Sequence, residues 1–316
     1  MKLQSTVAAL AATVFLSACA QLPQRSPLDP SGPALELADT PFYPQDAYQC
    51  GPAALATILG ASQVAVSPDE LTPQLYLPGR RGSLQAELIS AARRYGRVPY
   101  RLAPRWSAVE ESLGEGRPVL VLQNLGLSWL PRWHYAVVIG VDPQADRVLL
   151  RSGTEERLRM RARHFQHSWR GGDFWALVVA APDDPPQGAE PQRWLEAVAP
   201  FETLGQPELA LRAYTAAAER WPEVAPVWLA LGNARYALAD LPGAVRALRR
   251  ATQLAPGAAA YNNLAHVLAE LGCGTAARTA LDQARRQPDA PDWAEALVTT
   301  AVRVEAAPAA TGRCDF

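Results

Sequence analysis

The chain has 316 residues, of which 49% are hydrophobic and 19% charged. This is the composition of an ordinary globular protein, and it excludes a wholly disordered chain and a small disulfide-rich scaffold. The length predicts about two domains at roughly 150 residues each, and the net charge of −1 gives no reason to expect a nucleic-acid partner.

Residues 1–18 have the pattern of a signal peptide. Lys2 precedes an apolar stretch from Val7 to Ala18, which is too short for a membrane-spanning helix of about 20 residues. The stretch ends in Leu16-Ser17-Ala18-Cys19, which resembles a bacterial lipobox. That resemblance implies that Cys19 is lipidated and becomes the mature N-terminus. An ordinary signal peptide followed by a chance cysteine is the alternative.

The segment that follows is rich in proline and polar residues, so we expect residues 19–40 to form an extended tether. Ala20 stands where an aspartate would otherwise follow the lipidated cysteine. By resemblance to the enterobacterial sorting rule, this implies an outer-membrane lipoprotein that faces the periplasm, although the inner membrane stays open.

Residues 41–180 predict an α+β domain. Helical patterns begin near Gly51, after Ser67 in a capping box, at Ser83, and at a second capping box from Ser107 to Glu110. Short β-branched segments then predict strands at Pro118–Gln123, His134–Val141, Arg147–Arg151 and Phe174–Ala180. Helices followed by strands are typical of α+β domains.

Two positions in this domain have the chemistry of a nucleophile and its base. Cys50 lies where a helix begins, and the free amides and dipole of a helix N-terminus favour a thiolate. Gly51 would let a substrate approach the backbone. His134 opens an apolar strand and would form an ion pair with Cys50, then protonate the leaving amine. Gln45 would donate to the oxyanion beside the Cys50 N–H.

These segments resemble the bacteriocin-processing peptidases, which are papain-like cysteine peptidases that cut after double-glycine leaders. The resemblance covers about 140 residues and rests on the following motifs: Gln45 to Leu55, Arg81-Gly82-Ser83-Leu84, Arg117-Pro118-Val119-Leu120 and His134-Tyr135. It implies that Cys50 is the nucleophile, His134 the base and Gln45 the oxyanion residue. Such domains are usually fused to export transporters, and no transporter domain is recognised here, so leader cleavage is not expected to carry over with the fold.

The family usually has an aspartate that orients the histidine, and here Ser152 holds that place. Asp142 lies eight residues along the same strand as His134, roughly 26 Å away at about 3.3 Å per residue, and Asp146 lies at the same turn. We therefore expect Ser152, Thr154 or a backbone carbonyl to orient the imidazole. A neutral partner stabilises imidazolium less, which implies weak or narrow activity.

Other features of this domain carry weaker hypotheses. Cys50 itself has the alternative of an inert buried thiol in a peptidase-like binding domain. His164 and His167 suggest surface histidines rather than a metal pair, and we predict no metal and no cofactor. Alternating arginines predict one positive face of a strand, either solvated or steering an acidic substrate: Arg157, Arg159, Arg161 and Arg163.

Residues 181–190 are expected to be a linker, and a repeat of 34 or 35 residues follows it. Gly205, Ala210, Tyr214, Ala217 and Pro222 have counterparts 34 or 35 residues on, at Ala239/Asp240, Ala244, Leu248, Ala251 and Pro256, and again at Gly272, Ala277, Leu281, Ala284 and Pro288. This period resembles three tetratricopeptide repeats over 191–290, with a capping helix and tail over 291–316. The expected fold is thus a papain-like α+β peptidase domain followed by an all-α tetratricopeptide-repeat solenoid.

A repeat stack of this kind presents a concave groove to a partner segment. The candidate groove residues are Asn233, Arg235, Asn262, Asn263 and His266. The alternative is that they serve helix packing or lie on the helix surface. Cys273 and Cys314 either pair in an oxidising compartment or stay free.

The two halves of the chain carry opposite net charge. Residues 41–180 contain 16 arginines against 12 acidic residues, and residues 181–316 contain 12 arginines against 16 acidic residues. This difference favours docking of the two halves.

We therefore expect an envelope-anchored cysteine peptidase that hydrolyses a peptide or isopeptide bond through a thioester. Its repeats would recruit a peptide or protein substrate, or a partner, and its lipid would bind the membrane. Two alternatives remain: an inactive peptidase-like scaffold for an envelope assembly, and another papain-like chemistry such as amide transfer or cell-wall amidase activity.

Overall fold

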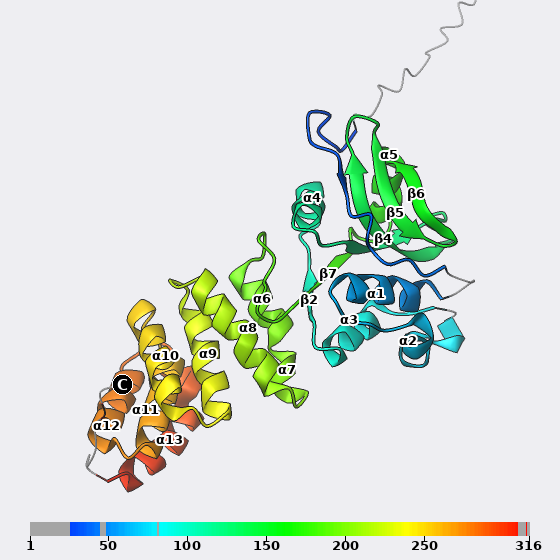
Figure 1. Ribbon diagram of the computed structural model, residues 1–316. Helices are drawn as coiled ribbons and strands as arrows, with labels where there is room; N and C mark the ends of the chain where they lie inside the picture. The colour runs from blue at the N-terminus through cyan, green and yellow to red at the C-terminus, as the bar shows by residue number, and fades with distance from the viewer. Residues whose placement is uncertain (1–25, 45–48, 81, 309–313, 315–316) are drawn as a thin grey trace, which may run out of the picture.

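The computed structural model describes residues 26–44, 49–80, 82–308 and 314. An α+β domain comes first, and the helices after it run away from that domain as an elongated arm (Figure 1). Cys19 and Gln45 lie outside the described residues.

Seven strands of the described residues form one antiparallel sheet in the order β2-β7-β3-β4-β5-β6, with β1 paired to β4. The strands are β1 (Leu35–Glu36), β2 (Val98–Arg101), β3 (Val119–Asn124), β4 (Trp133–Asp142), β5 (Arg147–Ser152), β6 (Glu155–Arg161) and β7 (Ala176–Ala180). The four expected strands are present with ends shifted by one or two residues, and β1, β2 and β6 are additional.

Helices cover both faces of this sheet, so its strands alternate between two apolar cores. Leu120, Leu122 and Tyr135 pack with α1 (Cys50–Ala61), α2 (Pro68–Leu75) and α3 (Gln85–Arg94). Val119, Val121 and Ala136 face the other way. That second face is covered by α4 (Trp106–Gly114) and α5 (Ala162–Arg170). The expected α+β domain is confirmed.

Of the two expected capping boxes, one is present. Ser67 Oγ accepts from the Glu70 N–H at 3.3 Å, and the Ser67 N–H donates to Glu70 Oε2 at 3.0 Å. The box at Ser107 is wrong, because α4 begins two residues earlier than a Ser107 cap requires, with Arg105 at the N-cap and no side-chain cap. Trp106 packs against Phe165 at 5.3 Å between ring centroids, so tertiary packing decides where this helix starts.

The structure differs from the expected tether over residues 26–40. Leu28 is 2% exposed, and β1 pairs with Val141 and Gly140 of β4. The buried guanidinium of Arg151 donates to the carbonyl oxygens of Ala38 and Thr40, both at 2.7 Å. A buried cation needs hydrogen-bond acceptors, and the backbone of residues 38–40 supplies them. These bonds and the β1–β4 pairing hold the segment against the sheet.

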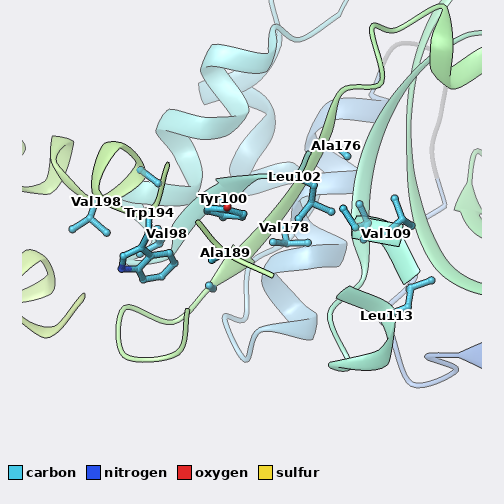
Figure 2. Close-up of a cluster of buried hydrophobic side chains, with 14 of the residues drawn as sticks. Val98, Tyr100, Leu102, Val109, Leu113, Ala176, Val178, Ala189, Trp194 and Val198 are labelled. Carbon is cyan, nitrogen blue, oxygen red and sulfur yellow. The ribbon is translucent and has the colours of Figure 1, made fainter. Parts of the chain in front are cut away.

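The expected linker, residues 181–190, is also held in place. Asp184 forms a 2.7 Å ion pair with Arg117, and the Glu190 N–H donates to the Tyr100 hydroxyl at 3.0 Å. Trp194 of α6 (Pro191–Val198) lies beside Tyr100 and Val98 of β2, in one buried cluster that continues from the sheet into the helices (Figure 2). The two halves therefore dock through this apolar cluster as well as through the Arg117–Asp184 ion pair.

The rest of the described chain is all-α, as expected. The helices are α7 (Pro200–Thr203), α8 (Pro207–Arg220), α9 (Ala225–Ala237), α10 (Leu241–Leu254), α11 (Ala258–Glu270), α12 (Gly274–Arg285) and α13 (Ala294–Ala306), with short 3₁₀ turns at Pro78–Arg80 and Ala290–Trp293. Among the described helices, none has the length and apolarity that a membrane span requires.

Cys273 and Cys314 form a disulfide, with Cα atoms 5.9 Å apart. Of the two alternatives, paired or free cysteines, the structure therefore has the paired form. Cys273 is buried in an apolar cluster of α10 to α13, so the bond ties the C-terminal tail to the start of α12.

Candidate active site

Cys50 is the first residue of α1, and α1 packs on β4. The backbone N–H groups of Tyr135, Gly51 and Cys50 itself are near enough to the sulfur to lower its pKa. Since Tyr135 directly follows His134, the fold brings the thiol to the strand position next to the predicted base. Cys50 is the free cysteine of the described residues.

Burial raises the pKa of the Cys50 thiol above its ordinary value, and the three backbone N–H groups lower it by less. The sequence had predicted a lowered pKa from the helix N-terminus alone. The shift has the opposite direction to that prediction, because the partly buried sulfur packs against the apolar cluster beneath α1. A neutral thiol is therefore the resting form at neutral pH.

His134 pairs with Ser152. Its Nε2 lies 2.8 Å from Ser152 Oγ, across the β4–β5 pair at the point where β4 begins and β5 ends. Burial is the larger cause that lowers the pKa of the imidazole, and the positive charge of Arg132 lowers it further. The ring is thus neutral at neutral pH. If Nε2 carries the proton and donates a hydrogen bond to Ser152, the unprotonated Nδ1 can accept a proton from another group.

The two aspartates near this hairpin have other partners. Asp142 accepts from the Ala145 N–H at 3.0 Å, and Asp146 accepts from the Ser26 hydroxyl at 2.7 Å. Both contacts lie at the turn between β4 and β5, at the opposite end of β4 from His134.

Gly51 has a packing role that the sequence did not indicate. A Cβ at this position would overlap the side chain of Ser83, so only glycine fits between α1 and the start of α3. Ser83 in turn accepts from the Tyr135 hydroxyl at 3.3 Å through its carbonyl oxygen, and its own Oγ is buried without a partner among the described residues. Ser83 is part of the site, and its presence in the Arg81–Leu84 motif was the only signal for it.

An apolar hairpin stands next to His134. Between β3 and β4, Leu125, Leu127, Trp129, Leu130 and Trp133 are all exposed, Trp129 by 76%. The turn is nevertheless ordered: Asn124 Oδ1 accepts from the N–H groups of Gly126 and Arg132, both at 2.9 Å. Sequence reasoning missed this hairpin, because its residues have no strand or helix periodicity.

The remaining candidates lie apart from Cys50. His164 and His167 are on α5, and no described cluster of histidine, cysteine and acidic residues is suited to hold a metal ion. The arginine stripe is shorter than expected, because Arg163 belongs to α5 and Arg157 forms an ion pair with Glu36. Arg159 and Arg161 remain on β6.

The five candidate groove residues lie on α9 and α11. Asn263 Nδ2 donates to Asn233 Oδ1 at 2.9 Å, which links the two helices. Arg235 pairs instead with Asp240 at the start of α10, at 3.1 Å. Asn262 and His266 line an open surface depression of about 460 Å³.

Residues 37–172 match the sequence model of the family described as Peptidase_C39 like. The match contains Cys50, His134 and Ser152, and it assigns this segment to a C39-like, cysteine-peptidase type of domain. No curated protein matches the chain significantly.

Three solved structures are similar to parts of the chain. A Bacillus anthracis protein described as a C39-like peptidase has 16% identity, covers 47% of this chain and 98% of its own, and has a TM-score of 0.40. The peptidase domain of Streptococcus ComA, a bifunctional ABC transporter of a quorum-sensing pathway, has 20% identity, covers 45% and 98%, and has a TM-score of 0.36. The TPR2B domain of yeast Sti1, in complex with an Hsp70 peptide, has 20% identity, covers 36% and 95%, and has a TM-score of 0.35. At these scores we draw nothing further from the three.

Proposed function

We propose that this chain is an envelope-anchored cysteine peptidase of the bacteriocin-processing type that hydrolyses a peptide or isopeptide bond through a thioester. The observation that carries the proposal is the position of the Cys50 sulfur. It lies at the N-terminus of α1, which packs on the strand that carries His134, and His134 contacts Ser152.

The proposed reaction starts from the neutral pair. His134 Nδ1 accepts the Cys50 proton as the sulfur attacks the substrate carbonyl, and Nε2–H donates to Ser152 throughout. The Cys50 N–H and the Gln45 side chain donate to the oxyanion. The tetrahedral intermediate collapses, the amine leaves with the proton from His134, and a thioester remains. Water, activated by His134, then attacks the thioester and restores the thiol.

The exposed hairpin supports a substrate with apolar side chains near the cleaved bond. Trp133 directly precedes His134, and the hairpin is held by Asn124 rather than left free. An ordered apolar surface beside a reactive pair suits the binding of large apolar groups, since aromatic side chains give much contact area at a low entropic cost.

The proposed location is the periplasmic side of the outer membrane, with a lipid on Cys19. The Cys273–Cys314 disulfide supports an oxidising compartment. Ser26 is bound to Asp146, so only residues 20–25 separate the described domain from Cys19. A fully extended chain of that length reaches about 25 Å, which would hold the peptidase close to the bilayer.

The proposed role of the helical arm is recruitment by three tetratricopeptide repeats. Helices α8, α10 and α12 begin at residues 207, 241 and 274, which follows the period in the sequence. The repeats would bind a substrate or a protein partner.

Two observations favour a second candidate, an inactive or weak peptidase-like scaffold for an envelope assembly. Ser152 replaces the acidic partner that such histidines usually have, and burial raises the pKa of the Cys50 thiol. Both lower the fraction of reactive thiolate. Structure and sequence favour the peptidase, because Cys50 begins the helix that packs on β4, and on that strand His134 lies 2.8 Å from Ser152.

The test compares the whole chain with its Cys50→Ala variant on envelope extract and on purified murein. If the chain is a peptidase, the variant retains a protein that the wild type releases in cleaved form, and mass spectrometry of the products identifies the bond. Release of murein fragments instead identifies an amidase. Equal recovery by both chains, with no cleaved product, supports the scaffold.

A further inference from the structure

Helix α5 presents a basic face to solvent. Its buried side chains belong to one side of the helix and pack toward the sheet: Ala162, Phe165, Ser168 and Trp169. At about 100° of turn per residue, the opposite side consists of four exposed residues, all of them basic: Arg163, His164, His167 and Arg170. From Arg157 to Gly172 the sequence contains five arginines, two histidines and no acidic residue. The exposed face of this helix therefore carries charge of one sign.

Arginines next to the helix extend this positive surface. Arg161 directly precedes α5 and lies opposite Arg147 of β5 in the strand register, where like charges repel each other. Two acidic residues flank the helix: Asp146, whose carboxylate accepts from the Ser26 hydroxyl at 2.7 Å, and Asp173 after its end. Arg147, Arg161, Arg163 and Arg170 outnumber them, and none of the four forms an ion pair with a described residue. The surface thus attracts an anionic partner from outside the chain.

The N-terminal segment of the domain begins beside this helix. Ser26 is bound to Asp146, and the carbonyl oxygen of Asp146 accepts from the N–H of Ala162, the first residue of α5, at 3.1 Å. Figure 1 shows the start of the dark-blue segment and α5 at the same end of the domain. Residues 20–25 separate Ser26 from Cys19 and reach about 25 Å when fully extended. A lipid on Cys19 would therefore hold the basic face of α5 close to a bilayer.

The position of α5 in the domain leaves the candidate active site open. Phe165 and Trp169 pack on one face of the sheet, whereas α1, which begins at Cys50, covers the opposite face through residues such as Leu55. A membrane that contacts α5 therefore lies on the other side of the sheet from α1. A substrate can approach Cys50 while the domain is docked.

We propose that the basic face of α5 binds the phosphate groups of anionic phospholipids in the membrane that holds the chain. The guanidinium groups of Arg161, Arg163 and Arg170 donate to the phosphate oxygens, a geometry for which arginine is well suited. Stable anchoring generally takes an acyl chain together with a second signal such as a basic surface, and α5 provides that signal. The inference rests on the proposed envelope location and does not depend on peptide hydrolysis.

The test measures vesicle binding by the chain of residues 20–316, which retains every described residue and carries no lipid. Vesicles of phosphatidylcholine alone are compared with vesicles that contain about 30 mol% phosphatidylglycerol, and bound protein is measured by co-sedimentation. We expect at least about 10-fold tighter binding to the anionic vesicles. Their advantage should disappear as NaCl rises from about 0.05 to 0.5 M, because salt screens surface charge.

Two triple variants with the same change in net charge locate the binding. Arg161→Gln/Arg163→Gln/Arg170→Gln should lower the affinity for anionic vesicles at least about 10-fold. The matched control is Arg246→Gln/Arg278→Gln/Arg286→Gln, whose three arginines are exposed on the helical arm, and its affinity should remain that of the unmutated chain.

Trp129→Ser is a second control. It removes the most exposed apolar side chain of the hairpin, which the proposed function assigns to peptide binding, and should leave vesicle binding unchanged. Loss of binding in this variant alone would make the hairpin, and not α5, the element that docks.

Equal affinity for the two kinds of vesicle, or equal losses in the two triple variants, would overturn the proposal. Binding to a soluble glutamate-rich peptide without binding to anionic vesicles would also overturn it, in favour of an acidic partner. If the α5 variant unfolds in a thermal melt, hydrogen exchange of the unmutated chain decides: anionic vesicles must protect α5 and leave α10 to α12 unchanged. Lipidation and hydrolysis are assayed separately, by the mass of the mature chain and by peptide cleavage, so their failure is distinguishable from failure of this surface.

Discussion

Burial acts in opposite directions on the two groups that transfer a proton at this site. Removal from water raises the pKa of the Cys50 thiol and lowers that of the His134 imidazole. Both shifts favour the pair in which the proton remains on sulfur. The thiol then becomes reactive only when His134 takes its proton, so the orientation of that ring by Ser152 has a direct effect on the rate.

The pH dependence of alkylation tests this charge state. Because the pKa of the thiol is raised, its reaction with iodoacetamide should accelerate as pH rises through and beyond 9.0, the ordinary thiol value. Labelling is followed by mass spectrometry, with Cys50→Ala as the control, since Cys273 and Cys314 are paired. A fast plateau from about pH 4 to 7, typical of a preformed thiolate–imidazolium pair, would show that the pair is ionised at rest.

Replacement of the orienting residue gives a second prediction at this scale. Ser152 Oγ lies 2.8 Å from His134 Nε2, so Ser152→Asp should place a carboxylate beside the imidazole. The negative charge should raise the pKa of the imidazole and increase kcat/KM by about 10-fold. Ser152→Ala should decrease kcat/KM by a similar factor. The acid limb of the pH profile should move to higher pH in the Asp variant only. Unchanged profiles in both variants would mean that Ser152 does not orient the ring.

At the scale of elements, apolar pattern and position predicted four of the seven strands. β3, β4, β5 and β7 are β-branched and buried, whereas β2 contains Pro99 and β6 alternates charged residues, so neither has an apolar run. The chain order placed Cys50 at a helix start and His134 in a strand. Sequence alone could not show that burial outweighs the helix N-terminus at Cys50, nor that Ser83 fills the space beside Gly51.

The hairpin between β3 and β4 gives a prediction about substrate binding. Trp129→Ser removes its most exposed side chain without touching Asn124, which holds the turn. Because one aromatic contact is lost, we expect KM for peptides with large apolar residues to rise about 10-fold. The values of kcat and the pH profile should stay unchanged. Val302→Ser, at a similarly exposed apolar site on α13, is the control. A fall in kcat with constant KM would contradict a binding role.

At the scale of the whole molecule, the boundary between apolar clusters does not coincide with the boundary between the two halves of the sequence. The core on the α4–α5 side of the sheet continues through Trp194 and Tyr214 into the first helices of the arm. A separate cluster holds the last helices, and it contains Cys273. The peptidase domain and the start of the arm should therefore unfold together, with the end of the arm as a second unit.

Loss of the disulfide should act on that second unit alone. The bond spans 41 residues, for which chain entropy gives a stabilisation of about 4 kcal/mol. In Cys273→Ser/Cys314→Ser, hydrogen exchange in α11 to α13 should become faster, while that in β3 and β4 stays as in the oxidised wild type. Faster exchange over the entire chain would contradict a separate terminal unit.

The central claim is that Cys50 cleaves a peptide bond with His134 as its base, and peptide hydrolysis by four purified chains tests it most directly. The substrates are fluorogenic peptides with large apolar residues, and the chains are wild type, Cys50→Ala, His134→Gln and the matched surface variant His164→Gln. Removal of either member of the pair should lower kcat/KM by at least about 100-fold, with thermal melts unchanged, and His164→Gln should retain full activity. Hydrolysis at the wild-type rate by the folded Cys50→Ala chain would contradict the account.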